Sequence, residues 1–386
     1  MENIHVVVGA GMWKQDGLRY RRHRLADFLA SQPETHQVFW VCPSPSQASD
    51  TRVGTSGTIE QWAIKDLLPQ KWFRFGRYVQ LLHKQKLESF VRRIQPLSGQ
   101  YHFYLWYTFP GFPVLSEMFH WDKVIYDCSD LWAAPISGRM SLAGKTRRQL
   151  ILNAEKHIVN RADQIFCTSD FLHLQTDLKL PAEKRNRVLT FENGVDYDLF
   201  ATNEHIPADF SDYAGKTVLG YIGGIKPKLD FSLIDAVARK KPDWQILLVG
   251  PDGTNGDPTF ARLLERNNVK WVGGVSPKEV PQYMRLITIG MMPYKSSPYN
   301  DAVFPLKLFE FLAAGISVVG VHLPSTKKYE EASVYTCLDS GDPEQLIRVF
   351  EQMEHGNDNQ TAVGRRKALA RSKDWPTIFT QMMEAL

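Results

Sequence analysis

The sequence predicts an α/β protein of two domains, each a doubly wound parallel sheet, and three observations support this. The chain has 386 residues, more than one ordinary domain holds, so two domains are the natural expectation. Hydrophobic residues make up 43% of the chain and charged residues 23%, as in typical globular proteins. Short apolar, β-branched runs, which predict buried parallel strands, alternate with segments of helical periodicity.

The first alternation runs from residue 4 to residue 200. The run IHVVVGAG (4–11) predicts a strand, and RYRRHRLADFLASQ (19–32) predicts a helix with Leu25, Phe28 and Leu29 facing inward. Further strands are predicted at 37–43, 101–110, 123–130 and 164–170, and a long helix at 147–162. The segment RVLTFENGVDYDLF closes this half, and the polar stretch 201–216 is the predicted linker.

The second alternation follows the linker. Its strands are predicted at 216–225, 244–251, 269–275, 288–294, 316–320 and 335–341, and its helices at 232–241, 260–268, 280–287 and 308–314. We therefore expect an N-terminal domain at 1–205, a C-terminal domain at 206–365, and a C-terminal helix at 366–386 that returns toward the first domain. Ligands of such sheets bind at the carboxyl ends of the strands, so we expect a central cleft where the two domains face each other.

Charge and cysteine usage narrow the class of protein. The net charge of +4 is small, so an anionic partner must be met by local patches. The four cysteines show no CxxC or zinc-type spacing, which predicts buried free thiols and a reducing, cytoplasmic setting. No segment matches a secretion signal, and no apolar run reaches the ~18 residues of a membrane span.

The segment AVFPLKLFEFLAAGISVVG (302–320) carries the chemistry of the second half. It predicts a loop, a short helix that ends at Gly315, and a buried strand. Lys307 and Glu310 share one face of that helix. A helix N-terminus with a lysine suits a diphosphate, a carboxylate one turn on can accept hydrogen bonds from a ribose diol, and Pro305 restrains the loop. The alternative is an exposed Lys307–Glu310 ion pair, although the rest of this helix is apolar.

These motifs also carry a resemblance. PLKLFEFLAAGISVVG resembles the donor-binding signature of glycosyltransferases with two Rossmann-like domains, the GT-B fold, and of family 4 in particular. FENGVDYDLF resembles the segment that ends their first domain, and LGYIGGIKPKLDF resembles the start of their second. LRYRRHRLADFLA, LWYTFPGFP and VIYDCSDLWAAPISGRM resemble bacterial glycosyltransferases of teichuronic acid biosynthesis, over a match from about residue 3 to about residue 380.

The resemblance implies an enzyme that moves a sugar from a nucleotide sugar, with UDP the leading nucleotide, to a lipid-linked cell-wall glycan. It implies that the second domain binds the donor and the first the acceptor. The sugars of teichuronic acid suggest glucuronic acid or N-acetylgalactosamine as the donor sugar. Glu310 would then bind the ribose, and Phe304, Pro305, Leu306 and Lys307 would surround the pyrophosphate and the sugar.

The sequence departs from the family pattern at two places. Ala302 stands where family 4 usually has a glutamate, and Gly224 and Leu229 stand where it has the arginine and lysine of a phosphate motif. Lys226 and Lys228 are near enough to substitute, unless they belong to a solvated turn. Retaining and inverting stereochemistry therefore both stay open.

The catalytic candidates follow a strand of the first domain. Asp127 and Asp130 lie in YDCSDLW. The position of Asp130 in this motif resembles that of the aspartate proposed as the general base in inverting glucuronosyltransferases. The alternative for either is a cap or loop carboxylate. Gly11 follows the first strand of the first domain, Gly223 and Gly224 follow the first strand of the second, and all three are further candidate donor contacts. Arg21 is another, with an equally good reading as part of a solvated helix face.

We expect no cofactor and no required metal ion, with the UDP-sugar serving as substrate. Asp196 and Asp198 form a DxD pair, which holds Mn²⁺ in single-domain glycosyltransferases, but here it follows the domain-closing segment and is read as structural. Two other functions remain as alternatives: a nucleotide-sugar 2-epimerase of the same shape, and a catalytically silent glycan-binding or assembly subunit.

A basic and aromatic stretch at 71–93 predicts peripheral association with the inner face of the cell membrane. Cations beside aromatic side chains suit an anionic lipid surface, and the residues expected to contact it are Trp72, Phe73, Arg74, Arg77, Lys84 and Lys86. The alternative is a helix packed by its aromatic side chains with a solvated basic face. Nucleic acid is not expected as a partner, because no nucleic-acid-binding motif accompanies the stretch.

Overall fold

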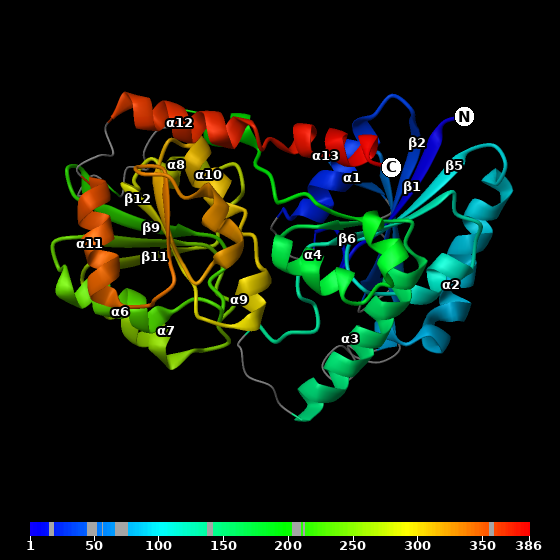
Figure 1. Cartoon of the computed structure of the whole chain (residues 1–386), viewed down its shortest axis with the longest axis horizontal. Helices are drawn as coiled ribbons and strands as arrows, with labels where there is room; N and C mark the ends of the chain where they lie inside the picture. The colour runs from blue at the N-terminus through cyan, green and yellow to red at the C-terminus, as the bar shows by residue number, and fades with distance from the viewer. Residues whose placement is uncertain are drawn as a thin grey trace. The chain divides into compact units, whose positions relative to one another are not determined.

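The computed structural model describes residues 1–14, 19–44, 52–55, 57–65, 76–136, 142–202, 210, 213–354 and 359–386. The chain divides into two compact units (Figure 1). Unit 1 contains Met1–Pro135, Met140–Glu192 and Phe379–Leu386, and unit 2 contains Ile136–Arg139 and Asn193–Ile378.

Unit 1 is built on a sheet that, in the described residues, has eight strands in the order β3-β4-β2-β1-β5-β6-β7-β8. Neighbouring strands are parallel except β3 and β4, which pair antiparallel at one edge. The strands are β1 (Asn3–Val8), β2 (Thr35–Ser44), β3 (Arg52–Val53), β4 (Ile59–Lys65), β5 (His102–Tyr107), β6 (Lys123–Cys128), β7 (Gln164–Cys167) and β8 (Val188–Thr190).

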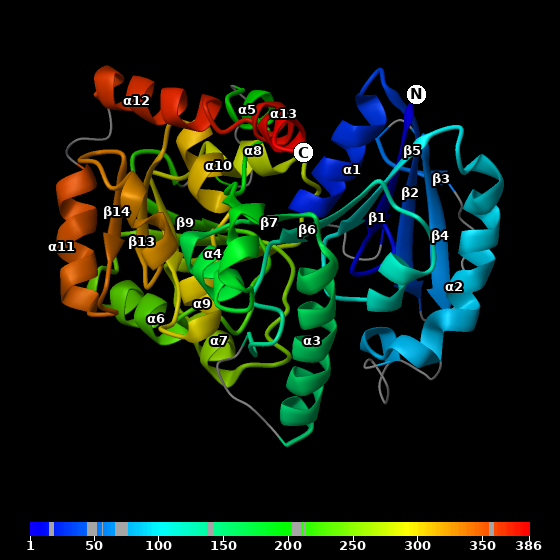
Figure 2. The same cartoon turned by 45° about the vertical axis from the view of Figure 1, so that its right-hand side comes forward.

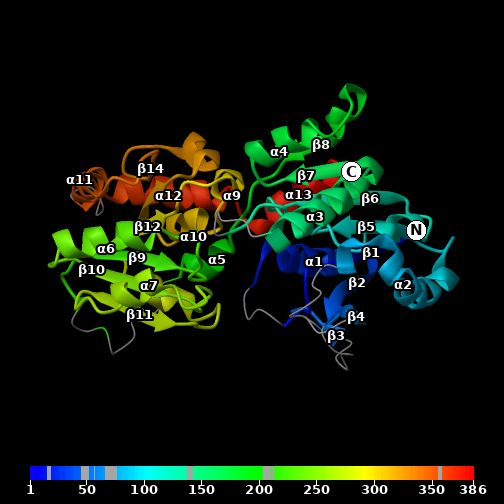
Figure 3. The ribbon, with the colours of Figure 1, turned by 90° about the horizontal axis from the view of Figure 1, so that it is seen from below.

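Helices cover both faces of this sheet. They are α1 (Arg21–Ser31), α2 (Gln80–Ile94), α3 (Leu142–Arg161) and α4 (Asp170–Asp177), with the 3-10 turns η1 (Gly76–Tyr78), η2 (Gln95–Leu97), η3 (Pro113–Glu117) and η4 (Ala182–Arg187). Figure 2 shows β1, β2 and β4 between α1 and α2, and Figure 3 shows β7 and β8 beside α4. The strands are continuously apolar because both faces are covered.

Unit 2 repeats this architecture with a parallel sheet of six described strands, in the order β11-β10-β9-β12-β13-β14. Its strands are β9 (Val218–Ile222), β10 (Gln245–Val249), β11 (Val269–Gly273), β12 (Ile289–Pro293), β13 (Ser317–Val321) and β14 (Tyr335–Leu338). Its helices are α5 (Tyr197–Phe200), α6 (Phe231–Lys240), α7 (Pro258–Leu263), α8 (Val280–Met284), α9 (Pro298–Ala302), α10 (Lys307–Ala313), η6 (Pro324–Tyr329), α11 (Pro343–Glu354) and α12 (Gln360–Arg371). In Figure 1, α6 and α11 cover one face and α8, α10 and α12 the other.

The predicted pair of doubly wound parallel-sheet domains is confirmed, and the differences are local. The strands β3, β4 and β8 were not predicted, because β3 and β8 have only two and three residues and β4 mixes polar and apolar positions. The expected C-terminal helix at 366–386 is instead two helices, α12 and α13 (Trp375–Glu384). They are separated where Val195 pairs with Asp374.

The chain enters unit 2 at Asn193, whereas the sequence prediction drew the boundary at 205. The physical reason is that the segment after Glu192 packs into unit 2, where Val195, Tyr197 and Phe200 belong to its core. The end of the chain returns to unit 1, where Phe379 packs against Phe28 on α1.

Two further expectations concern the whole chain. All four cysteines are buried and free, as predicted: Cys42, Cys128, Cys167 and Cys337. None of the helices in the described ranges combines the length and the apolar character needed to cross a membrane.

Candidate functional site

The segment with Lys307 and Glu310 lies at the carboxyl edge of the unit 2 sheet, between β12 and β13. The helix α10 starts at Lys307, one residue before the predicted start, and is held in place by its apolar residues Leu308, Phe309, Phe311, Leu312 and Ala313. Lys307 and Glu310 are half-buried on the remaining side. Its C-terminal turn is fixed by Arg366, whose guanidinium donates to the carbonyl oxygen of Gly315.

The loop before α10 is tied to the segment that opens unit 2. The side-chain amide of Asn193 donates to the carbonyl oxygen of Phe304 over 2.6 Å. The Phe304 ring is buried against Phe309 and Tyr329, so it stabilises the loop from inside. Pro305 is also buried, and Leu306 is half-buried. Asn193 was not among the predicted site residues, although its place in the motif FENGVD offered a signal.

Lys307 extends from α10 to the end of β9. An ideal Cβ placed on Gly223 would lie 2.3 Å from Lys307 Cε and 2.4 Å from its Nζ, so this side chain passes directly over the glycine. Gly223 has φ +130°, a value that L side chains rarely adopt, and Gly250 at the end of β10 has φ +144°. A Cβ on Gly250 would meet the carbonyl oxygen of Gly223 at 2.2 Å. The two glycines therefore let two strand ends and a lysine share one small space.

The turn after β9 places the other two predicted lysines. Lys226 lies against Gly224, whose ideal Cβ would be 3.2 Å from Lys226 Cε. Lys228 Nζ lies 4.8 Å from the ring centroid of Tyr294, directly after β12, and the carbonyl oxygen of Lys228 accepts from the side-chain amide of Asn300. This half-buried turn is packed on the sheet rather than freely solvated.

Unit 2 thus brings Lys228, Lys307, Tyr221 and Tyr294 together at the ends of β9 and β12. Lys307 Nζ lies 5.3 Å from the ring centroid of Tyr221. Burial acts to raise the pKa of Tyr294, but the Lys228 and Lys307 ammonium groups outweigh it and lower that pKa below its usual value. Two lysine cations beside glycine-rich strand ends are suited to the charge of a diphosphate. Tyr221 and Tyr294 were not predicted as site residues, because in the sequence both belong to segments that predict only strands.

In unit 1, Arg21 and Asp127 form a buried ion pair. Arg21 Nε lies 3.0 Å from both carboxylate oxygens of Asp127, and the two side chains are 3% and 1% exposed. Arg21 also donates to the carbonyl oxygen of Glu192 and lies against the sulfur of Met382. Removing one partner of such a pair leaves a buried charge and costs about 3–5 kcal/mol. The pairing gives Arg21 and Asp127 a structural role.

Asp130 differs from Asp127. It lies two residues beyond the end of β6 and is half-buried, so solvent reaches this residue at the carboxyl edge of the unit 1 sheet. Its backbone carbonyl accepts from the amide of Trp132. Of the two predicted catalytic carboxylates, Asp130 has the accessibility that a general base needs.

The glycine loop after β1 is shaped by Trp40. A Cβ on Gly9 would lie 2.2 Å from the Trp40 ring, and the indole N–H of Trp40 donates to the carbonyl oxygen of Gly11. The ring of His23 stacks on this indole, and burial lowers the pKa of His23 to about 3, so His23 is neutral. Gly11 and Arg21 belong to unit 1, whereas the other predicted donor contacts belong to unit 2.

The basic stretch at 71–93 is described only in part, because Trp72, Phe73 and Arg74 lie outside the described residues. Arg77 donates to the carbonyl oxygen of Ala10, and Lys86 to that of Lys65. The helix α2 buries Leu87, Phe90 and Ile94 and exposes Lys84 and Arg92. The described half is therefore a packed helix with a basic outer face.

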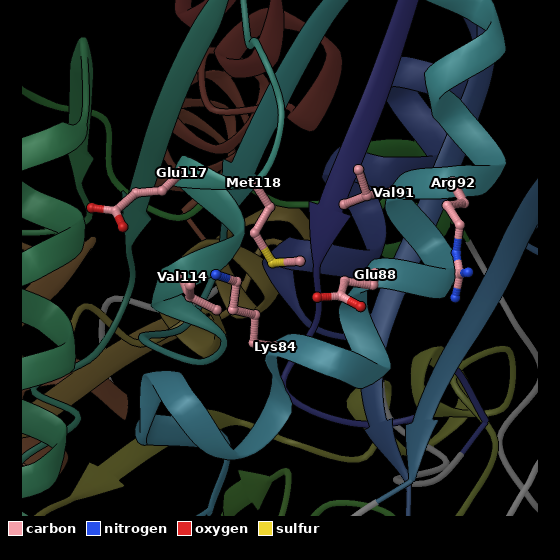
Figure 4. Close-up of a pocket in the computed structure, with 7 residues that line it drawn as sticks. All are labelled: Lys84, Glu88, Val91, Arg92, Val114, Glu117 and Met118. Carbon is pink, nitrogen blue, oxygen red and sulfur yellow. The ribbon is translucent and has the colours of Figure 1, made fainter.

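A groove of about 550 Å³ lies between α2 and η3 (Figure 4). It is lined by Lys84, Glu88, Val91, Arg92, Val114, Glu117 and Met118. Two cations and two carboxylates balance there, so the groove itself does not favour one sign of charge.

The DxD pair flanks a third carboxylate. Asp374 accepts from the backbone amide of Tyr197, and burial together with the charges of Asp196 and Asp198 raises the pKa of Asp374. Within the described ranges, histidine, cysteine and acidic side chains form no group of three or more with a geometry that could hold a metal ion.

The two parallel-sheet units have the fold of the two-domain GT-B glycosyltransferases. The family model of the group 1 glycosyl transferases matches residues 216–354. The chain is 53% identical over 385 residues to a Bacillus subtilis (strain 168) protein named as a teichuronic acid biosynthesis glycosyltransferase, TuaH, covering 99% of this chain and 96% of that protein. The chain belongs to this glycosyltransferase family.

Two solved structures share the fold over nearly their whole length. Sucrose-phosphate synthase from Thermosynechococcus elongatus superposes with a TM-score of 0.73 at 15% identity, covering 99% of this chain and 98% of that one. HepE of Anabaena in complex with UDP-glucose superposes with a TM-score of 0.70 at 17% identity, with the same coverage. The range matched by the family model contains the lysine and glycine cluster of unit 2.

Proposed function

We propose that this glycosyltransferase moves a sugar from a UDP-sugar to a lipid-linked cell-wall glycan in teichuronic acid biosynthesis. The observation that carries the donor half is the convergence of Lys307, Lys228 and Gly223 at the strand ends of unit 2, with Glu310 on the same helix as Lys307. The relative named for teichuronic acid, which is 53% identical, supports the choice of pathway. UDP-glucuronic acid and UDP-N-acetylgalactosamine are the first donors to test.

The roles of the residues follow from their positions. The ammonium groups of Lys307 and Lys228 take up the charge of the diphosphate, and Glu310 accepts hydrogen bonds from the ribose hydroxyls. Because two cations neutralise the leaving UDP, the reaction needs no bound metal. Asp130 acts as the general base if the reaction inverts the sugar.

The proposed acceptor requires the enzyme to work at the inner face of the cell membrane. A lipid-linked acceptor stays in the bilayer, so the enzyme must approach an anionic surface. The exposed Lys84 and Arg92 of α2 supply cations for this, each worth about 1 kcal/mol near such a surface.

The donor half is tested by thermal stabilisation with a panel of UDP-sugars and one GDP-sugar, followed by calorimetry with UDP. A ligand that binds only the folded chain raises its melting temperature. In Glu310→Gln, the loss of charge-assisted hydrogen bonds weakens UDP binding by about 1.5–3 kcal/mol. Glu265→Gln, at an exposed position of unit 2, is the matched control and keeps the affinity.

Transfer to a lipid-linked acceptor is then followed by release of UDP. Isomerisation of the nucleotide sugar without an acceptor would indicate the epimerase, and binding without turnover would indicate the silent subunit. An unchanged UDP affinity in folded Glu310→Gln removes Glu310 from the donor site.

A further inference from the structure

Tyr294 is a buried tyrosine with no assigned role in the proposed reaction. It follows β12 directly and is 0% exposed, and its hydroxyl faces the side chains of Tyr221 and Lys228, which interact with it although neither makes a hydrogen bond of standard geometry. A buried hydroxyl without a well-aligned hydrogen bond destabilises the folded chain. A residue that keeps such a group at the edge of a binding site calls for a functional explanation.

Other buried tyrosines of the chain behave differently. Tyr107 donates to the carbonyl oxygen of Phe112, Tyr126 donates to Glu155, and Tyr335 bonds with the hydroxyl of Thr326. Burial raises the pKa of each of these three. The pKa of Tyr294 is lowered in spite of equally complete burial. The charges of the Lys228 and Lys307 ammonium groups lower it most, and the Tyr221 side chain acts in the same direction.

Those groups reach Tyr294 from two separate elements. Lys228 comes from the turn after β9, with its Nζ 4.8 Å from the Tyr294 ring centroid, and Lys307 comes from α10. Tyr221 on the adjoining strand β9 faces the same space and donates to the carbonyl oxygen of Gly224. The neighbouring Lys295 donates to the carbonyl oxygen of Pro227.

We propose that Tyr294 is a positioning residue of the donor site, whose buried hydroxyl holds Lys228 and Lys307 as a pair of cations for the diphosphate of the donor. The proposal rests on the proposed function of the unit 2 site. Tyr294 acts through the two lysines and does not itself touch the sugar.

The chemistry of the hydroxyl suits this role. A neutral tyrosine can accept a hydrogen bond from an ammonium group without cancelling its charge, whereas a carboxylate at the same place would neutralise it. Both positive charges therefore remain available to the ligand. The α10 carboxylate, Glu310, is left to serve the ribose.

The proposal is tested by measuring the affinity of the full chain for UDP by calorimetry as a function of pH. Tyr294→Phe keeps the ring under Lys228 and removes only the hydroxyl, so we expect UDP binding about 3- to 10-fold weaker near neutral pH. In the wild type, affinity falls as the pH rises through the pKa of Tyr294, because tyrosinate competes with the diphosphate for the lysines. In Tyr294→Phe this decline moves to higher pH.

Tyr335→Phe is the matched control, since it removes the hydroxyl of another buried tyrosine of unit 2, one that bonds with Thr326 and whose pKa is raised by burial. Its UDP affinity and pH profile should match the wild type. If Tyr294→Phe does not fold, tyrosinate absorbance replaces it. One tyrosine should ionise at lower pH than the others, UDP should raise the pKa of that tyrosine, and Lys228→Met should raise it too.

The outcomes separate the two proposals. A wild-type chain that binds no UDP overturns the proposed function. A wild type that binds UDP, with an identical affinity and pH profile in Tyr294→Phe, overturns the role of Tyr294 and leaves the donor site in place. In the absorbance experiment, an early tyrosine ionisation that responds to neither UDP nor Lys228→Met also overturns it.

Discussion

Replacing Gly223 by alanine tests whether the end of β9 and Lys307 form one diphosphate site. The added Cβ would lie 2.3 Å from Lys307 Cε, whereas carbon atoms in normal contact are about 3.5–4 Å apart. Gly223 is held in place because its backbone amide donates a hydrogen bond to the carbonyl oxygen of Val249. The lysine side chain must therefore be the group that moves, by more than about 1 Å.

The magnitude follows from the contact that is lost. A charge-assisted hydrogen bond between the ammonium group and a phosphate contributes about 1.5–3 kcal/mol, so UDP binding should weaken about 10- to 150-fold. A second cost falls on stability, because φ +130° is strained for alanine by about 1–2 kcal/mol. Gly273→Ala is the matched control: its φ is +88°, and no atom lies within 4 Å of its ideal Cβ. It should lose stability and keep its UDP affinity.

The assay is a double-mutant cycle by calorimetry with UDP, using Gly223→Ala, Lys307→Met and the combined variant, each checked for folding by circular dichroism. If the glycine acts by leaving room for the lysine, then Gly223→Ala costs little further affinity once Lys307 is gone. The reasoning fails if Gly223→Ala weakens UDP equally in both backgrounds, or if it leaves the affinity of the otherwise wild-type chain unchanged.

The remaining predictions concern metal, membrane and pH. Transfer activity should survive EDTA because lysine cations carry the diphosphate charge, and a strict requirement for Mn²⁺ would contradict this. The double variant Lys84→Gln/Arg92→Gln should sediment less with anionic vesicles and equally with neutral ones. The control Arg262→Gln/Lys270→Gln changes two exposed cations of unit 2 and should bind anionic vesicles like the wild type. Equal binding of the two double variants would show that α2 does not contact the membrane surface. The pKa of His23 is about 3 in the folded chain and 6.5 in the unfolded chain. As the pH falls below 6.5, His23 is protonated in the unfolded chain but stays neutral in the folded chain, which favours unfolding. The free energy of unfolding therefore drops by about 2 kcal/mol near pH 5. Urea unfolding of His23→Gln should lack this share of the decline, and an identical pH dependence would refute it.

Local pattern was enough to predict the architecture and one side of the proposed donor site. Each buried strand is a run of apolar side chains in consecutive positions, and each amphipathic helix has its own period, so both are legible without knowledge of the fold. The same holds for Lys307 and Glu310, which are three residues apart on one helix and therefore share a face wherever that helix lies. Strands as short as β3, with two residues, carry too little pattern to be found this way.

Only the tertiary structure decided the partners of the charged and polar side chains. Arg21 and Asp127 are 106 residues apart in a sequence that suggested a phosphate contact for the first and a catalytic role for the second. In the structure they pair with each other in the core of unit 1. Asn193 reaches Phe304 across 111 residues, and Tyr294 gains its lysines from a turn and a helix on either side of it in the sequence. Such pairings depend on which strands become neighbours in the sheet. That order is set by the packing of the whole unit, whereas hydrophobic periodicity records only whether each segment has a face to bury.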